Sequence, residues 1–291
     1  MLTILFDGVA YGMLLFILAV GLAVTMGLMN FINLAHGAFA MAGGYITVVL
    51  MQRFDVPFLA CLPIAFAGSA LLGAVLERTL YRPMYRKPHL DQVLFSIGLT
   101  FMAVAATDYF MGSTQQIMQL PGFLRGRTEI GSGAWTLGMG HYRIFIIAVC
   151  AALTVALQFV LARTRFGSRL RASVDDQRVA AGLGINVNVV FLATFAFGSG
   201  LAGLGGALGA EVLGLDPTFP LKFMIYFLIV VAVGGTSSIT GPLLAALLLG
   251  IADVAGKYSI PKLGAFIVYS LMIAILIWRP QGLFSRGGGK A

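Results

Sequence analysis

The chain has 291 residues, of which 59% are hydrophobic and only 10% are charged. A soluble domain carries about 25% charged residues, so this composition excludes a soluble globular protein and indicates a polytopic membrane protein. The net charge of +8 does not indicate nucleic-acid binding, because the basic residues lie beside apolar segments rather than in one surface block. Cys61 and Cys150 both fall in apolar segments, so we expect buried thiols rather than a disulfide.

Apolar segments long enough to cross a membrane recur along the whole chain. A spanning helix needs about 20 predominantly apolar residues, and we therefore predict an all-α, polytopic membrane helix bundle of about eight or nine spans. The second and eighth segments are the least regular, and either is compatible with a half-helix that enters and leaves on the same side. The predicted spans cover about 7–29, 31–51, 57–77, 91–112, 143–162, 189–210, 222–240, 242–256 and 264–279.

The junction between the first two segments carries polar residues that interrupt an otherwise apolar run. Such side chains are costly at membrane depth unless they face a cavity or a partner. We predict a broken helix that lines a translocation path. The alternative is a tight helical hairpin in which the asparagines satisfy backbone groups. The residues assigned to the path are Asn30, Asn33, His36, Gly37, Gly43 and Gly44.

The longest polar interruption covers residues 163–188. It contains five of the nineteen basic residues of the chain, and a basic loop between two spans belongs on the cytoplasmic side. The five are Arg163, Arg165, Arg169, Arg171 and Arg178.

A short helix is predicted within this loop. It begins with a serine N-cap, Ser173, and two aspartates occupy its first turn, where the helix dipole favours negative charge. Small residues follow, and a glycine ends the helix. We predict that the helix docks into a groove of a partner protein, and the alternative is an ordinary anchoring loop. The residues assigned to docking are Ser173, Asp175, Asp176, Arg178, Ala180, Ala181, Gly182 and Gly184.

Segment 112–142 is rich in glycine and polar residues with short alternating stretches, which predicts a small hairpin on the outer membrane face. Farther along, Gly205 and Gly209 form a GxxxG pair, which favours close helix packing over a ligand site.

We predict that the N-terminus lies outside and the C-terminus inside. This topology places twelve basic residues inside and seven outside, in accord with the positive-inside rule.

Residues suited to catalysis or metal binding form no recognisable pattern. His36, His89 and His141 are widely separated, and no Ser/His/Asp arrangement follows from the spacing. Asp108 and Asp253 lie near predicted span ends, so the sequence predicts no ionisable group deep in the bundle. A proton- or sodium-driven carrier usually needs such a group. We therefore expect no enzymatic activity, metal or cofactor in this chain, and an energy source in a partner.

Three separated motifs carry a family resemblance. The first comprises Phe166-Gly167, Leu170-Arg171-Ala172, Asp176, Ala180 and Gly184-Ile185-Asn186; the second covers 30–39 and 43–45; the third covers 234–242. The first follows the spacing of the ATPase-contacting loop of ABC-type permeases. Together the motifs resemble the bacterial high-affinity branched-chain amino acid permease family, most closely its smaller permease subunit, over nearly the whole chain.

The resemblance implies that residues 1–291 form a single transmembrane permease domain of an ATP-driven ABC importer in the bacterial inner membrane, with 163–188 as its cytoplasmic coupling loop. Implied partners are a second, homologous permease subunit in a heterodimer, two cytoplasmic ATPase subunits that hold ATP and magnesium, a periplasmic substrate-binding protein and membrane lipid, with no nucleic acid. The expected cargo is leucine, isoleucine and valine. The alternatives are a permease for urea or short amides and a secondary carrier that works alone.

Overall fold

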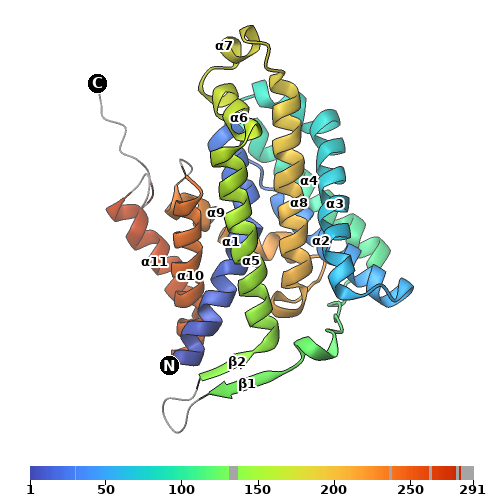
Figure 1. Ribbon diagram of the computed structural model, residues 1–291, viewed down its shortest axis with the longest axis vertical. Helices are drawn as coiled ribbons and strands as arrows, with labels where there is room; N and C mark the ends of the chain where they lie inside the picture. Colours follow the sequence, from blue (N-terminus) through green and yellow to red (C-terminus); the bar gives the residue numbers. More distant parts are fainter. Residues whose placement is uncertain (30, 131–136, 236–237, 262–263, 280–281, 283–291) are drawn as a thin grey trace.

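The computed structural model describes residues 1–29, 31–130, 137–235, 238–261, 264–279 and 282, which form a bundle of long helices with a two-stranded sheet at one end (Figure 1). The long helices are α1 (Leu2–Met29), α2 (His36–Phe54), α3 (Phe58–Leu76), α4 (His89–Met111), α5 (His141–Arg163), α8 (Val187–Leu213), α9 (Phe219–Gly234), α10 (Thr240–Ser259) and α11 (Gly264–Trp278). The shorter elements are η1 (Glu77–Tyr81), η2 (Arg82–Arg86), η3 (Gly122–Leu124), β1 (Arg127–Ile130), β2 (Leu137–Gly140), α6 (Arg165–Asp175) and α7 (Gln177–Gly182).

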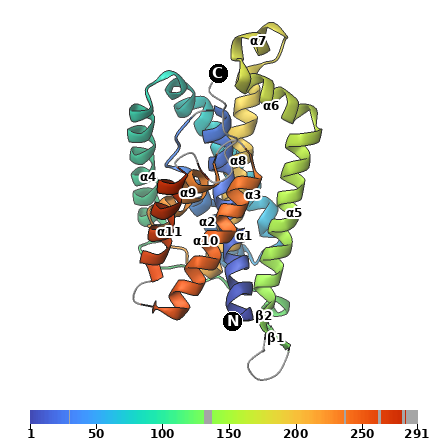
Figure 2. The ribbon, with the colours of Figure 1, turned by 90° about the vertical axis from the view of Figure 1, so that its left-hand side faces the viewer.

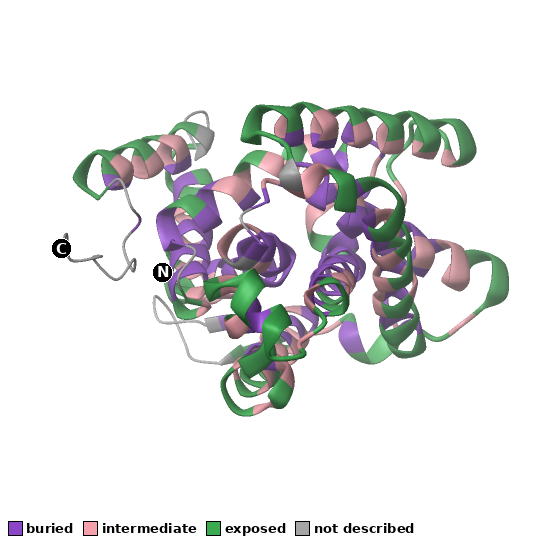
Figure 3. Cartoon of the chain, turned by 90° about the horizontal axis from the view of Figure 1, so that it is seen from above, coloured by how far each residue is buried: buried purple, intermediate pink, exposed green. Residues whose placement is uncertain are grey.

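Six helices in the described part of the chain are long and apolar enough to cross a membrane, and two shorter apolar helices accompany them. The prediction of an all-α, polytopic membrane bundle is therefore confirmed. Helices α1 and α8 are mostly buried, whereas few residues of α4 and α5 are buried. Figure 3 shows buried residues in the centre with exposed ones around the rim. Cys61 and Cys150 are buried free thiols, as predicted.

The eighth predicted segment is a full-length helix, whereas the seventh and ninth are shorter. Helix α10, the eighth segment, has 20 residues and qualifies as a span, so a half-helix there is wrong. The seventh segment, α9, has 16 residues and the ninth, α11, has 15. The eighth segment appeared short because Asp253 and Lys257 interrupt its apolar run. The helix continues through them because these two side chains form an ion pair at 2.5 Å.

The broken helix near the N-terminus is confirmed. Its second part, α2, begins deeper in the bundle than predicted. Helix α1 ends at Met29, but His36, the first residue of α2, places its Nε2 3.0 Å from the carbonyl oxygen of Leu18. Leu18 lies eleven residues before Met29, which is about 16 Å along a helix that rises 1.5 Å per residue. Helix α2 therefore starts beside the middle of α1, after a non-helical segment at membrane depth.

Side chains of α4 satisfy the backbone of this non-helical segment. The N–H of Ile32 donates to Oε1 of Gln92 at 3.3 Å, and the N–H of Leu34 donates to Oγ of Ser96 at 3.1 Å. Irregular backbone is tolerated at membrane depth only when protein groups replace the missing helical hydrogen bonds. Gln92 and Ser96 are both buried, so these polar residues of α4 hold the break in place.

Helices α2 and α8 approach each other so closely that their backbones touch. A Cβ atom on Gly206 would lie 1.8 Å from the carbonyl oxygen of Ala40, and one on Gly43 would lie 2.1 Å from that of Gly203. Small residues allow such contact between membrane helices. The crossing thus depends on Gly43 of α2 and Gly206 of α8. The predicted pair, Gly205 and Gly209, lies beside Gly206 on α8.

Gly206→Leu is expected to destabilise the isolated permease strongly. The new side chain would overlap backbone atoms of α2, which cannot move away as a flexible side chain does, so the cost exceeds the ~1–3 kcal/mol of ordinary overpacking. Gly98→Leu is the matched control, because nothing lies within 4 Å of a Cβ there. Thermal unfolding in detergent measures the difference, and equal midpoints for both variants would contradict this packing.

Candidate functional site

Helices α6 and α7 form the end of the molecule opposite the N-terminus and the hairpin of β1 and β2 (Figure 1). Figure 2 shows the turn between α3 and α4 at the same end as α7. The two basic loops of the sequence therefore share one end, while the hairpin occupies the other. This arrangement fits the predicted sidedness, in which the basic loops are cytoplasmic.

The helix cap in this region is Asp176, so the prediction of Ser173 as the cap is wrong. Oδ1 of Asp176 accepts hydrogen bonds from the N–H groups of Arg178 and Val179, at 2.8 and 3.0 Å. Ser173 is instead buried inside α6, where its Oγ donates to the carbonyl oxygen of Arg169 at 2.8 Å. Both residue types are good caps, but the carboxylate satisfies two free N–H groups at once, and the single predicted helix becomes two.

Helix α7 presents an exposed apolar surface. Val179 and Leu183 are 59% and 75% exposed, and Ala181 and Gly182 between them are also exposed. Ala180 is the member of this group that faces inward and is buried. Neighbouring exposed apolar residues at one end of a molecule indicate an interaction surface.

The C-terminal end of α7 and the charged residues beside the helix set the limits of this apolar surface. Gly184 has a φ of 81°, in the left-handed region, and ends the helix as predicted. The N–H of Ile185 then donates to the carbonyl oxygen of Ala180 at 3.0 Å. Asp175 and Arg178 are exposed beside the apolar surface, so they border it with charge of both signs.

Helix α6 is joined tightly to the end of α5. A Cβ atom on Gly167 would lie 2.1 Å from the carbonyl oxygen of Leu161, so only glycine fits there. Arg171 donates to the same carbonyl, and Thr164 caps α6 by accepting from the N–H of Gly167 at 3.3 Å. A displacement of α7 and α6 would therefore be passed directly to the membrane-spanning helix α5.

The broken segment places Asn33 at the centre of a buried cluster. Its Oδ1 accepts hydrogen bonds from the N–H of Ala35 and the hydroxyl of Tyr81, each at 3.1 Å. The side chain is 1% exposed, and its Nδ2 has no partner in the described part of the chain. Asn33 thus performs the backbone-satisfying role of the alternative interpretation and retains two unused donors. Asn30 lies outside the described residues.

The other residues assigned to the path are packed against neighbouring helices. His36 is buried and bonded to α1, as described above. Added Cβ atoms on Gly37 and Gly44 would lie 3.0 Å from Pro220 and 2.9 Å from Leu215, and Gly43 contacts the backbone of α8. The structure therefore gathers these residues around the start of α2, and a role in translocation stays a prediction. Gly205 and Gly209 face Leu18 and Leu14 of α1.

Two acidic residues are buried, although the sequence places Asp253 near the end of a span and Glu77 at the border of a loop. Glu77 begins the π-helical turn η1 and accepts a hydrogen bond from the Tyr85 hydroxyl at 3.1 Å. Asp253 accepts one from the Tyr226 hydroxyl at 3.2 Å, in addition to its ion pair with Lys257. For Glu77, the sequence contains its partner only as a tyrosine eight positions later, and this spacing alone does not predict a hydrogen bond. Among the described residues, no group of three or more His, Cys, Asp or Glu is placed to hold a metal ion.

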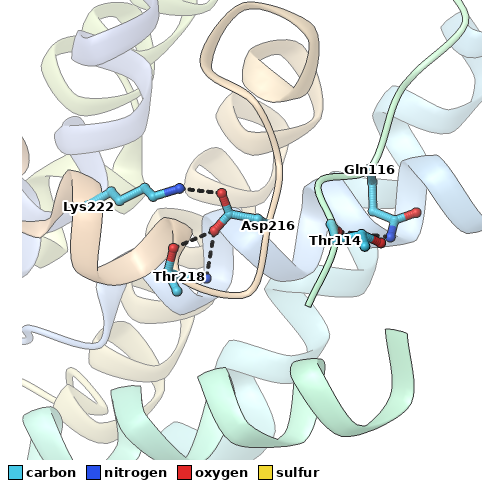
Figure 4. Close-up of polar contacts among 5 residues, drawn as sticks. All are labelled: Thr114, Gln116, Asp216, Thr218 and Lys222. Carbon is cyan, nitrogen blue, oxygen red and sulfur yellow. Dashed lines mark hydrogen bonds and ion pairs between the residues drawn. The ribbon is translucent and has the colours of Figure 1, made fainter. Parts of the chain in front are cut away.

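The opposite end carries a polar turn between α8 and α9. Figure 4 shows Asp216 bonded to Lys222 and Thr218, beside Thr114 and Gln116 of the segment that follows α4. Burial raises the pKa of the Asp216 carboxyl, but the hydrogen bonds from Lys222 and Thr218 outweigh it, so this pKa lies below its usual range. The carboxylate stays charged and keeps the turn closed at neutral pH.

The predicted hairpin in segment 112–142 is present. Strands β1 and β2 are antiparallel, with Arg127 opposite Gly140 and Ile130 opposite Leu137. The N–H of Gly138 donates to Oγ1 of Thr3 at 3.0 Å, which attaches the hairpin to the start of α1.

Single cysteines test the sidedness of the two ends. With Cys61 and Cys150 replaced by alanine, a membrane-impermeant maleimide added to intact cells is expected to label Glu129→Cys in the hairpin. It should not label Arg82→Cys or Arg178→Cys until the membrane is permeabilised. All three positions are exposed. Labelling of Arg178→Cys in intact cells would reverse the topology.

A bundle of long apolar helices with a break in the middle of the bundle and an exposed helical tip at one end defines a polytopic membrane protein. Residues 4–276 match the family model described as "Branched-chain amino acid transport system / permease component". The chain therefore belongs to this family, and it is a multi-pass membrane protein.

Known relatives match this chain along nearly its full length. The chain is 27% identical over 97% of its length to the high-affinity branched-chain amino acid transport system permease protein BraD of Pseudomonas aeruginosa, 95% of which is covered. It is 26% identical to LivH of Escherichia coli K12, over 97% of this chain and 94% of the relative. It is also 28% identical to LivM of the same organism, over 93% of this chain and 68% of the relative. No solved structure matches the chain.

Proposed function

We propose that this chain is a permease subunit of an ATP-driven ABC importer that carries leucine, isoleucine and valine across the inner membrane. The observation that carries the proposal is α7, an exposed small and apolar helix at the end of the molecule that bears both basic loops. The relatives named for branched-chain amino acid transport support the choice of cargo. The chain hydrolyses no ATP itself, and its role is to form the passage.

In the proposed cycle, two cytoplasmic ATPase subunits dock on α7 and move it when they bind ATP. The movement reaches α5 through the contact of Gly167 with Leu161, where no side chain separates the two helices. A second, homologous permease subunit completes the passage, and the similarity of this chain to both LivH and LivM supports such a pairing. A periplasmic binding protein delivers the amino acid to the hairpin and the turn at Asp216.

The start of α2 is the proposed place where the cargo passes. A helix N-terminus favours an anion, and Asn33 holds two unused amide donors beside it. Neutral donors can bind the carboxylate of an amino acid without fixing a charge in the membrane. The apolar residues that surround the break suit an aliphatic side chain.

Uptake into proteoliposomes tests the cargo. The complex of this chain with its partner permease and ATPases, supplied with binding protein and internal ATP, is expected to accumulate labelled leucine, isoleucine and valine, and no urea or acetamide. The same complex with a hydrolysis-deficient ATPase is the control. Uptake of urea with none of leucine would replace the proposal with its closest alternative.

A further inference from the structure

Two adjoining cavities lie at the end of the molecule that carries α6 and α7. The first, of about 220 Å³, lies between α1, α5, α6 and α8, and the second, of about 360 Å³, lies between α1, α5, α6 and the residues that begin α10. Val24, Leu161 and Leu170 line both cavities, so the two cavities lie side by side. We call the pair of cavities the α5–α6 recess.

The recess is apolar inside and polar at one side. Leu157, Phe166 and Phe197 line the first cavity, where Thr194 has the only polar side chain among the described residues of the lining. The hydroxyl of Thr194 is already bonded to the carbonyl oxygen of Val190 at 2.7 Å. Gln158, Arg171, Ser238 and Thr240 line the second cavity together with its apolar residues. Such a space suits a molecule with an apolar chain and a polar head.

Arg171 lines the polar side of the recess, and three further arginines lie near it along the chain. Arg163, Arg165, Arg169 and Arg171 all lie within nine residues of one another, and none forms an ion pair in the described part of the chain. Arg171 donates to the carbonyl oxygen of Leu161, which leaves most of the five donors of its guanidinium unused. The head of a matching ligand is therefore an anion.

We propose that the α5–α6 recess binds an anionic phospholipid of the cytoplasmic leaflet, with one acyl chain in the cavities and its phosphate bound by Arg171 and the neighbouring arginines. Basic pockets between membrane helices on the cytoplasmic side bind such lipids. The depth also fits. Leu157 lies six residues before Arg163 on α5, about 9 Å below the basic end of the helix, where acyl chains begin.

This lipid would touch α5 and α6 at their joint. It would brace the short helices whose position the proposed coupling uses, yet its binding depends neither on the cargo nor on an ATPase. A free phosphate is a poorer occupant, because it leaves the apolar cavities empty.

Photo-crosslinking to the purified permease tests the site. The protein in phosphatidylcholine nanodiscs receives a trace of phosphatidylglycerol with a diazirine in its acyl chain, and labelled peptides are mapped by mass spectrometry. We expect labels on residues 157–170, and at least several-fold weaker labelling by the matching phosphatidylcholine probe. Equal labelling by both probes, or labels spread evenly over the exposed helices, would overturn the proposal without any variant.

Variants test the contacts of the lipid head group and of its acyl chain separately. Arg171→Gln is expected to reduce phosphatidylglycerol labelling about tenfold, the loss that one charged hydrogen bond represents. Ala193→Phe, at an exposed position that lines the first cavity, should reduce it by filling the space of the chain. Arg178→Gln on α7, outside the recess, is the matched control and should keep full labelling. Unchanged labelling of well-folded Arg171→Gln and Ala193→Phe, or competition by glycerol phosphate as strong as by the whole lipid, would contradict a phospholipid site.

Discussion

Ala181→Trp is expected to abolish transport while leaving the permease folded and inserted. Ala181 lies on the exposed surface of α7 between Val179 and Leu183, so a large ring meets no atom of the chain itself. It would instead separate the surfaces of the permease and its ATPase. Loss of only 1.4 kcal/mol of binding weakens association about tenfold, and a misplaced ring in the centre of a small interface costs more than that.

The experiment compares Ala181→Trp with Ala106→Trp, which adds the same ring to the exposed face of α4. Membrane insertion, recovery of ATPase subunits with the tagged permease, and uptake per inserted permease are measured for both. We expect equal insertion, and loss of both ATPase recovery and uptake for Ala181→Trp alone. Normal assembly and uptake would show that residues 163–188 form only an anchoring loop.

Asn33→Leu is expected to reduce both the amount of assembled complex and the transport by each complex. Leucine accepts no hydrogen bond, so the N–H of Ala35 and the hydroxyl of Tyr81 lose their partner inside the protein. Each buried group left unpaired costs about 1–3 kcal/mol. The fall in assembly follows from this loss, and the fall in transport follows from removal of the two unused donors of Asn33.

Tyr81→Phe is the control that separates these effects. It removes the hydroxyl that bonds Asn33 but keeps the ring that packs against Phe31, Phe95 and Phe195. We expect a modest loss of assembled complex and unchanged uptake by each complex. If Asn33→Leu also leaves uptake per complex unchanged, Asn33 only supports the backbone and does not border the path.

The positions of the long helices could be predicted because membrane burial requires continuous apolar runs. The break after Met29 was also predictable, since Asn33 and His36 stand where lipid-facing polar groups are too costly. The depth at which α2 begins, beside Leu18 of α1, could not be predicted. It depends on hydrogen bonds from the broken segment to Gln92 and Ser96 of α4. Nothing in the local pattern links these residues to the break.

Predictions failed where two residues of similar chemistry competed or where a charge found a distant partner. Ser173 and Asp176 both suit an N-cap, and only the observed break between α6 and α7 selects Asp176. Asp253 lies near the end of the predicted eighth span, and its bonds to Lys257 and Tyr226 hold it inside a helix that continues to Ser259. The hydroxyl of Tyr226 comes from another helix, so sequence spacing could not reveal it.

The dependence of uptake on ATP decides whether this chain works as part of an ATP-driven importer. Proteoliposomes that contain the full complex are loaded with ATP or with a non-hydrolysable analogue, and proteoliposomes that contain this chain alone receive a proton or sodium gradient. We expect leucine uptake only by the full complex with hydrolysable ATP. Gradient-driven leucine uptake by this chain alone would contradict it.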